Sequence, residues 1–286
     1  MHFIHGYALP PTFGTMRQLL FTATLLASLL ARAGGEHWPV GARFAGMGHA
    51  NLTLVDLWSV RGNQAGLAGL EHPVAGAYYQ QHWLSGDLAM QGLAFALPVG
   101  KGCFAVNGSS FGRADLFNEQ QFGLAYAMKL SDNFRVGIQL DYLNMRFGEN
   151  YGSTNAVTAE AGLQAKLSDH LWIGAHLYNP TQAKIGGPYE EKTPTVFGAG
   201  LGYTFNDQVL MCAQADKDID RDAQYRVGIE YRPVKALFVR AGVSTGPTQA
   251  HFGAGVRVKT VEIDLAVAAR SQLGITPMFN LNYRFE

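Results

Sequence analysis

The sequence is poor in charged residues and contains only two cysteines. Charged side chains account for 15% of the 286 residues, against roughly 25% in ordinary soluble domains. The 22 basic and 22 acidic residues cancel, so no excess of positive charge indicates a nucleic-acid partner. Cys103 and Cys212 are far apart in the sequence and match no metal-binding spacing. A disulfide between them stays an open alternative, since exported proteins can form one.

The sequence also lacks an apolar run of about 20 residues, the length that a membrane-spanning helix needs. A shorter run, LLFTATLLASLL, follows Met16-Arg17 and precedes Ala31-Arg32-Ala33. A basic start, a short apolar core and an A-x-A site are typical of a secretory signal. We therefore predict a signal peptide at residues 16–33, with residues 1–15 an over-called start and a membrane anchor as the alternative. An exported chain without spanning helices is either soluble or a β-barrel of the outer membrane.

From Val74 onward the sequence is dominated by an alternation of apolar and polar residues. Every second residue is apolar in NFRVGIQLDYL, which begins at Asn133, and the pattern recurs in YRVGIEY from Tyr225 and VEIDLAV from Val261. A strand places alternate side chains on opposite faces, so these segments have one apolar and one polar face. A soluble sandwich would bury the apolar face in a core, whereas an outer-membrane barrel would turn it to lipid. Periodicity alone does not separate these two folds.

The connections between the alternating segments favour the barrel. Short turns such as PVGK, LSDN and FNDQ alternate with longer connections such as FGRADLFNE, FGENYGS and NPTQAKIGGPYEEKT. Short turns at one rim and long loops at the other are typical of outer-membrane barrels. The C-terminal segment MFNLNYRFE alternates in the same way and suits a closing strand, although a last strand of a soluble β protein is the alternative.

We therefore predict an all-β fold, a transmembrane antiparallel outer-membrane β-barrel of about fourteen strands over residues 74–286. An even number of strands leaves both ends of the barrel at the rim with the short turns. The strands are expected to start near Val74, Gly86, Gly102, Gln120, Asn133, Thr154, His170, Thr193, Gln208, Ala223, Ala236, Thr248, Thr260 and Thr276.

The glycine-rich stretch GARFAGMGHAN, residues 41–51, does not match a nucleotide-binding loop. No apolar strand precedes it, Asn51 stands where a dinucleotide fingerprint has its third glycine, and no Gly-Lys-Ser/Thr follows. The nine histidines show no metal-ligand spacing, and no serine has a nucleophile-elbow setting. We therefore predict no catalytic residues, no metal and no cofactor, and a protein that is not an enzyme.

The stretch GARFAGMGHANLTLVDLWSVRGNQAGLAGL, residues 41–70, resembles the N-terminal signature of the FadL-like outer-membrane barrels. It is closer still to the PorV/PorQ-type branch of Bacteroidota, which has a G-A-R-x-x-G-M-G run and an Asn-Pro-Ala-Gly-Leu-like turn. Here Gln64 replaces the usual proline of that turn. The resemblance implies that residues 34–73 fold inside the barrel mouth as a plug or hatch, with a flexible leader as the alternative. The plug residues that it singles out are Gly41, Arg43, Gly46, Gly48, Asp56, Asn63, Gln64 and Gly66.

Polar residues on the strands are expected to face the lumen and to hydrogen-bond this plug. They are Arg135, Gln139, Asp141, Arg226, Glu230, Glu262, Asp264 and Arg284. Trp58, Trp83 and Trp172 are expected at the membrane interfaces, where aromatic girdles lie in such barrels.

The resemblance implies two functions, and the sequence pattern is also compatible with a third. FadL-like barrels imply passive transport of hydrophobic or small molecules across the outer membrane, with the plug as a gate. The PorV/PorQ-type branch implies an accessory of type IX protein secretion or surface attachment, with secretion-machinery proteins as partners. The third alternative is a structural β protein of the envelope. The expected surroundings are outer-membrane lipid and lipopolysaccharide, and the expected ligand is hydrophobic.

Overall fold

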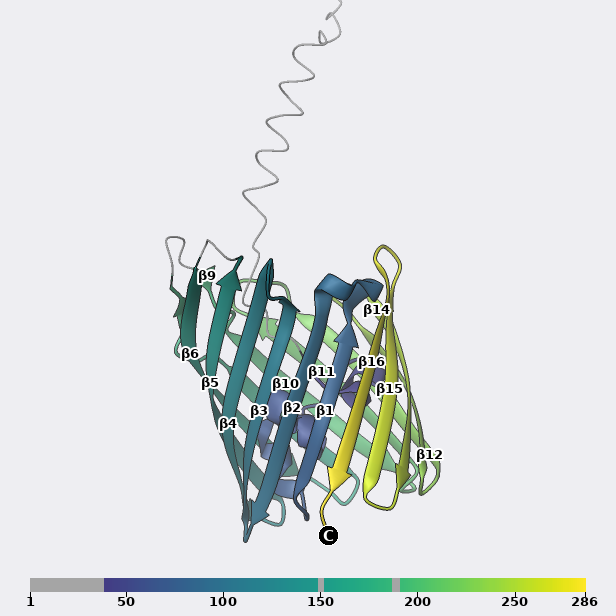
Figure 1. The fold of residues 1–286 in the computed structure, drawn as a ribbon. Helices are drawn as coiled ribbons and strands as arrows, with labels where there is room; N and C mark the ends of the chain where they lie inside the picture. Colours follow the sequence, from purple (N-terminus) through teal and green to yellow (C-terminus); the bar gives the residue numbers. More distant parts are fainter. Residues whose placement is uncertain (1–38, 149–151, 187–190) are drawn as a thin grey trace, which may run out of the picture. The chain divides into compact units, whose positions relative to one another are not determined.

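The computed structural model describes residues 39–148, 152–186 and 191–286, which belong to one compact unit (Figure 1). Fourteen antiparallel strands form one closed barrel, and two short strands, β8 and β9, pair separately in one connection. The predicted signal peptide and the predicted over-called start lie outside the described residues.

The barrel strands follow one another around the wall in chain order. They are β1 (Val74–Gln81), β2 (Ala89–Val99), β3 (Gly102–Arg113), β4 (Phe117–Ser131), β5 (Phe134–Phe147), β6 (Ser153–Lys166), β7 (Leu171–Tyr178), β10 (Val196–Phe205), β11 (Val209–Asp218), β12 (Gln224–Val234), β13 (Leu237–Ser244), β14 (Gln249–Val258), β15 (Val261–Arg270) and β16 (Gly274–Arg284). The remaining elements are β8 (Lys184–Ile185), β9 (Glu191–Lys192), α2 (Ala42–Gly46) and the 3₁₀ turns η1 (Leu57–Arg61), η2 (Gln64–Gly69), η3 (His82–Leu84) and η4 (Gly86–Leu88).

The predicted fourteen-stranded barrel is confirmed, and each predicted strand start lies within three residues of an observed one. The second strand begins at Ala89 rather than Gly86, because Gly86–Leu88 forms a 3₁₀ turn. Several connections that were expected to be long are short. The strands β3 and β4 stay paired up to Arg113↔Phe117, so the FGRADLFNE segment is mostly strand.

The barrel closes where β1 pairs with β16, with Val74 opposite Arg284. Both ends of the barrel therefore lie at one rim, together with tight turns such as that between β14 and β15. We call this the short-turn rim and the opposite one the long-loop rim. In outer-membrane barrels the short turns face the periplasm. Closure pairs every edge, which a sheet in hydrocarbon requires because no water is present to satisfy its backbone.

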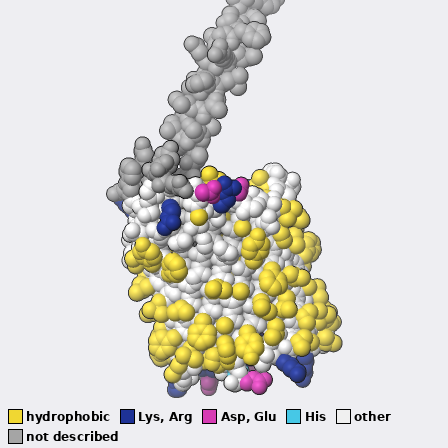
Figure 2. Space-filling view, viewed as in Figure 1, with side chains coloured by type: hydrophobic (Ala, Val, Ile, Leu, Met, Phe, Trp, Pro, Cys, Tyr) yellow, Lys and Arg dark blue, Asp and Glu magenta, His cyan; other side chains and the backbone are white. Residues whose placement is uncertain are grey.

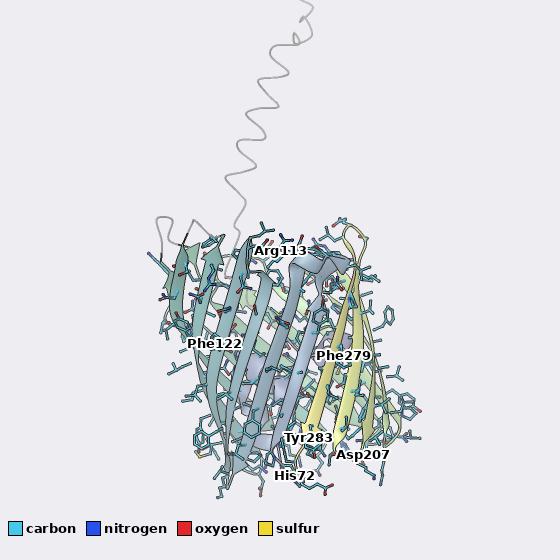
Figure 3. The ribbon with its side chains drawn as sticks, viewed as in Figure 1. His72, Arg113, Phe122, Asp207, Phe279 and Tyr283 are labelled. Atoms are coloured by element: carbon cyan, nitrogen blue, oxygen red, sulfur yellow. The ribbon has the colours of Figure 1, made fainter. Side chains whose placement is uncertain are left out.

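The outer face of the barrel is apolar and the inner face polar, as the alternation predicted. On β5, the side chains of Ile138 and Leu140 are 62% and 60% exposed, whereas Gln139 and Asp141 between them are 2% and 1% exposed. Hydrophobic side chains cover the wall and charged ones gather near its two ends (Figure 2). Phe122 and Phe279 project from this wall, between Arg113 at one rim and Asp207 at the other (Figure 3). Such a surface suits contact with acyl chains.

Both cysteines are buried and free, so the disulfide that the sequence left open is not formed. In the part of the chain that the structure describes, no helix is long and apolar enough to cross a membrane.

A charge on the lipid-facing side should weaken the barrel far more than a charge on a loop. Ile138 lies near the middle of β5, and we expect Ile138→Arg to lower the free energy of unfolding in bilayers by about 2–4 kcal/mol. The matched control is Leu116→Arg, at a 58% exposed residue in the connection between β3 and β4. Urea unfolding from vesicles measures both. Equal effects of the two changes would contradict a lipid-facing wall.

Candidate functional site

The interior of the barrel is crossed by the chain that precedes β1, residues 39–73, which we call the inner segment. Pro39 lines a cavity towards the long-loop rim, and Val74 begins β1 at the short-turn rim. Between them, α2 packs against β13 to β16, and η2 packs against β3 to β6. Phe44, Met47 and Leu67 of this segment are fully buried. The inner segment is therefore part of the protein core.

Inward-facing glycines let the inner segment touch the wall, backbone to backbone. A methyl group built on Gly228 of β12 would lie 2.7 Å from Cβ of Met47. One built on Gly242 of β13 would collide with the peptide between Met47 and Gly48. On the other side of the barrel, a methyl group on Gly137 of β5 would lie 2.5 Å from the carbonyl carbon of Gln64. These strand positions admit no side chain while the inner segment is in place.

The inner segment carries glycines at matching points. Gly41 has φ +110° and Gly48 has φ +65°, backbone conformations that residues with a side chain rarely adopt. Gly46 faces Gly253 of β14, where a methyl group would lie 3.1 Å from the opposite Cα. A methyl group on Gly66 would collide with the carbonyl oxygen of Leu54. The four predicted glycines thus lie at close approaches or turns within the barrel.

Charged groups tie α2 to the wall. Arg43 donates two hydrogen bonds of 2.9 Å to the two carboxylate oxygens of Glu230, and its third nitrogen reaches Asp56 at 3.2 Å. Arg240 of β13 binds the same Glu230 at 2.6 Å and Asp264 at 2.6 Å. Glu230 is therefore held between a guanidinium of the inner segment and one of the wall. Fork-like pairing of this kind is directional as well as strong.

Two of the predicted plug residues also cap the 3₁₀ turns. The side chain of Asp56 accepts from the backbone N–H of Trp58, and that of Asn63 accepts from Ala65. Asn63 also donates to the carbonyl of Leu163 on β6 at 2.9 Å. Such side-chain caps satisfy backbone groups that a short turn leaves unpaired.

Trp58 does not lie at a membrane interface, so that expectation is wrong. The side chain is 1% exposed inside the barrel, and its Nε1 donates to Asn282 of β16 at 3.0 Å. Composition identifies an aromatic residue but not the face that it occupies. Trp83 is 36% exposed in η3, and the ring of Trp172 lies 4.3 Å from the guanidinium of Arg135.

Most of the predicted lumen-facing residues contact each other or the inner segment. Arg226 pairs with Asp216 at 3.2 Å and reaches the carbonyl of His49 at 3.4 Å. Glu262 pairs with Arg257 of the wall. Arg284 is exposed at the short-turn rim. Gln139 and Asp141 are buried on β5, where they join a separate cluster with Gln121 and Glu160.

Sequence reasoning missed several anchors of the inner segment. Gln214 accepts from the N–H groups of Asn51 and Leu52, and Gln164 donates to the carbonyls of Leu52 and Leu54. The others are Glu160, which accepts from the side chain of Gln64, and Asn280, which accepts from the N–H of Ala42 at 2.6 Å. All four occupy inward positions of alternating strands, so the alternation with a period of two was the signal that could have identified them.

A cavity of about 460 Å³ lies above the inner segment, towards the long-loop rim. Its lining combines apolar residues with many polar ones, among them Leu52, Trp83, Val196, Asp216, Arg226 and Met278. Clefts of roughly 300–1,000 Å³ are the usual size for small-molecule sites. His82 also lines this cavity, and burial lowers its pKa to about 4. The imidazole is therefore neutral at neutral pH.

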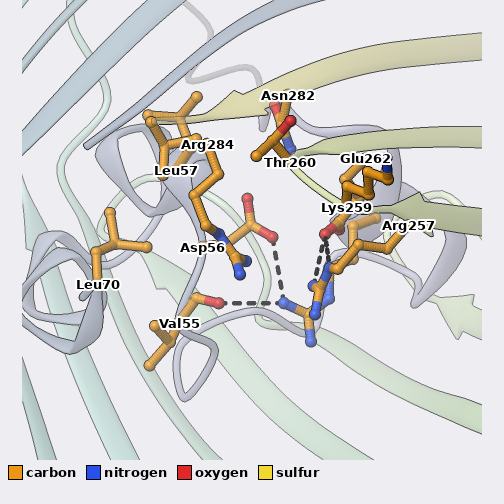
Figure 4. A pocket seen from close by; sticks show the side chains of 12 residues that line it. Val55, Asp56, Leu57, Leu70, Arg257, Lys259, Thr260, Glu262, Asn282 and Arg284 are labelled. Carbon is orange, nitrogen blue, oxygen red and sulfur yellow. Dashed lines mark hydrogen bonds and ion pairs between the residues drawn. The ribbon is translucent and has the colours of Figure 1, made fainter. Parts of the chain in front are cut away.

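A second, smaller cavity of about 60 Å³ lies at the short-turn rim, beneath the inner segment (Figure 4). Asp56 and Val55 of the inner segment face Arg257, Glu262 and Arg284 of the wall across it. Its charged lining and small volume suit water or ions better than an organic ligand. Within the described ranges, no group of three or more His, Cys, Asp or Glu could hold a metal ion.

Comparison with known proteins reveals the fold but no close relative. No protein-family model and no curated protein matches the chain. A TodX monoaromatic hydrocarbon channel mutant superimposes with a TM-score of 0.66 at 12% identity, covering 86% of this chain and 99% of that one. A FadL homologue of Pseudomonas aeruginosa gives 0.61 at 13% identity, covering 89% and 100%. The toluene transporter TodX of Pseudomonas putida gives 0.63 at 12% identity, covering 85% and 96%.

The chain therefore has the fold of the FadL-type and TodX channels. Its closed barrel, with an apolar wall outside and polar groups inside, is an outer-membrane β-barrel of a bacterial cell.

A side chain at the glycine contacts should displace the inner segment. We expect Gly242→Ala to lower the free energy of unfolding by about 1–3 kcal/mol, the usual cost of overpacking, because the methyl group meets backbone that has no room to move. The same change should expose residues of the inner segment to added protease. Thermal unfolding in detergent and limited proteolysis measure the two effects.

The control is Gly108→Ala on β3, where the new methyl group would meet Phe122 at an ordinary 3.4 Å. It should leave stability and protease resistance unchanged. Identical behaviour of the two variants would show that the inner segment does not depend on close backbone approach.

Proposed function

We propose that the protein passively transports small hydrophobic molecules across the outer membrane, with the inner segment as the gate. The cavity of about 460 Å³ towards the long-loop rim carries the proposal. It is the size of a small-molecule site, and it lies in a barrel whose interior is otherwise crossed by packed chain. A ligand that enters it would rest directly on the inner segment, at Leu52 and Asn51.

The similar structures support the same class of ligand. They are a monoaromatic hydrocarbon channel, a toluene transporter and a FadL homologue. The apolar part of the cavity lining, which includes Trp83, Val196 and Met278, offers contact for a ring or a short chain. The polar lining would orient a ligand through a few hydrogen bonds, as in most small-molecule sites.

The contacts of α2 favour the inner segment as a gate that opens by local release. Its charged attachment to the wall is concentrated in Arg43, whereas the wall pair of Glu230 and Arg240 persists without it. Loss of the Arg43 contacts would therefore weaken the attachment of α2 and leave the ion pair of Glu230 and Arg240 in the wall intact. Passive flow needs no further chemistry, so the proposal includes no catalytic residue and no cofactor.

The second candidate is a PorV/PorQ-like accessory of type IX secretion or surface attachment. It is favoured by three short connections at the long-loop rim, residues 114–116, 245–248 and 271–273. Short connections at this rim leave the ends of the strands accessible to a protein partner. Cross-linking in the native membrane, followed by mass spectrometry, would recover secretion-machinery proteins if this candidate were correct.

Transport is tested by filling the cavity. Cells with an intact lipopolysaccharide layer and without other FadL-type channels should take up radiolabelled toluene faster when they carry the protein. Ala268→Trp should reduce that rate several-fold, because buried Ala268 lines the cavity. Ala269→Trp on the outward side of the same strand should not. Uptake equal to that of cells lacking the protein would contradict the proposal.

The gate is tested at Arg43. We expect Arg43→Met to weaken the docking of α2 by about 1.5–3 kcal/mol, the range for hydrogen bonds to charged groups, and to raise the leak of a small polar solute from proteoliposomes. Arg257→Met removes a comparable ion pair that joins only wall strands, and it should leave the leak unchanged. A gate that opens elsewhere would make both variants behave like the original protein.

A further inference from the structure

The outer wall of the barrel carries uncharged polar residues on β2 to β6, at the outward positions towards the long-loop rim. Residues directly opposite one another in antiparallel strands share a face of the sheet. Five polar residues are opposite one another in this way, strand after strand, and form one row across the wall: Gln91, Ser110, Gln120, Asn144 and Asn155. On β5, Asn144 continues the outward series of the exposed Ile138 and Leu140.

A second row lies one step closer to the long-loop rim. Asn118 is opposite Arg146, and Arg146 is opposite Ser153. Asn118 joins the two rows, because its Nδ2 donates to Oγ of Ser110 at 2.9 Å. The side chain of Arg146 is exposed, and it is the only charged one at the described outward positions of β2 to β6. We call the residues of these two rows the polar face.

The polar face begins where the hydrocarbon layer of the membrane is expected to end. On β5 the apolar outward positions run from Phe134 to Tyr142. A tilted strand crosses the hydrocarbon with about 9–11 residues, so the next outward residue, Asn144, lies at the level of the lipid head groups. In Figure 2, hydrophobic side chains are sparser over the upper part of this side of the barrel than over its lower part.

On the opposite side of the barrel the apolar wall continues to the long-loop rim. Tyr225 lies at the start of β12 and Val243 near the end of β13, both at that rim, and their outward side chains are 59% and 52% exposed. The polar face is therefore a local feature of one side of the wall. A feature of this kind indicates a particular neighbour rather than the general boundary between membrane and water.

The side chains of the polar face match a head group that contains both sugars and phosphate. An Asn or Gln side chain has two N–H donors and a carbonyl acceptor, which suit the hydroxyl groups of a sugar. A guanidinium such as that of Arg146 binds a phosphate through parallel hydrogen bonds. Acyl chains offer neither kind of partner, and polar groups without partners are costly in an apolar environment.

We propose that the polar face binds the head group of a phosphorylated glycolipid of the outer leaflet, the class to which lipopolysaccharide belongs. Arg146 binds a phosphate, and the amides of Gln120, Asn144 and Asn155 bind the sugars. The acyl chains of the same lipid lie along the apolar wall below, against exposed residues such as Leu140. The inner side of β3 to β6 packs against η2, so the bound lipid also stabilises the part of the wall that holds η2.

The test is the binding of purified lipids to the detergent-solubilised protein, measured by native mass spectrometry and by the midpoint of thermal unfolding. Lipid A with two phosphates should bind and raise the midpoint, because a ligand that binds only the folded state stabilises it. Lipid A without phosphates should bind more weakly, and so should phosphatidylglycerol, which has a phosphate but no sugar. Equal binding of the three lipids would overturn the proposal.

Variants locate the binding. Arg146→Gln should lower the affinity for phosphorylated lipid A about tenfold, as the loss of a hydrogen bond to a charged group does, and should leave the affinity for the dephosphorylated form unchanged. Gln120→Leu combined with Asn144→Leu should weaken the binding of both forms, which keeps the test decisive if the first variant does not fold. The control is Lys217→Gln, at an exposed outward-facing cation of β11, and it should change neither affinity.

Two further results would overturn the assignment. The first is an unchanged affinity for both forms of lipid A in Arg146→Gln and in the double leucine variant. The second is a protein that purifies as a dimer and that the double leucine variant converts to a monomer, because the polar face would then contact a second copy of the chain. Neither result bears on the proposed transport, which takes place inside the barrel.

Discussion

The close approach of two backbones inside the barrel is the contact on which the rest of the structure depends. The inner segment lies against Gly137, Gly228 and Gly242 so tightly that no side chain fits between. Because the interior is packed there, the polar groups on the inner face cannot all reach water and must find partners in the inner segment. Gln164 and Gln214 do so by bonding its backbone directly. The close packing and the need to pair buried polar groups therefore constrain the same residues.

The electrostatics of the interior differ between its two sides. Next to α2, Arg43 and Arg240 neutralise Glu230 and Asp264 through direct contacts, so charge and hydrogen bonding are both satisfied. Across the barrel, the carboxyl groups of Asp141 and Glu160 accept hydrogen bonds from glutamine side chains, and Arg61 acts electrostatically on both. The direct ion pairs that hold the inner segment therefore lie on the side of α2.

The barrel could be predicted from the sequence because lipid and backbone chemistry leave few choices. Alternation along β5 identified its outward face, and turns such as LSDN located its ends. The partners across the interior could not be predicted, since the contact between Arg43 and Glu230 joins residues 187 positions apart. Trp58 shows the same limit, because an aromatic residue suits a membrane interface and a packed interior equally well. The glycines of the inner segment were identified by resemblance, but the glycines opposite them were not.

The distribution of space inside the barrel follows from where the inner segment runs. It occupies the level of α2, η1 and η2, where the wall contributes glycines, and leaves a cavity of about 460 Å³ on one side and of about 60 Å³ on the other. In the proposed function, a solute that passes through the interior displaces part of this segment. The α2 side is held by the ion pairs of Arg43 and by the close approaches at Gly228 and Gly242, and the η2 side by the close approach at Gly137. An opening at α2 therefore separates ion pairs and backbone contacts together.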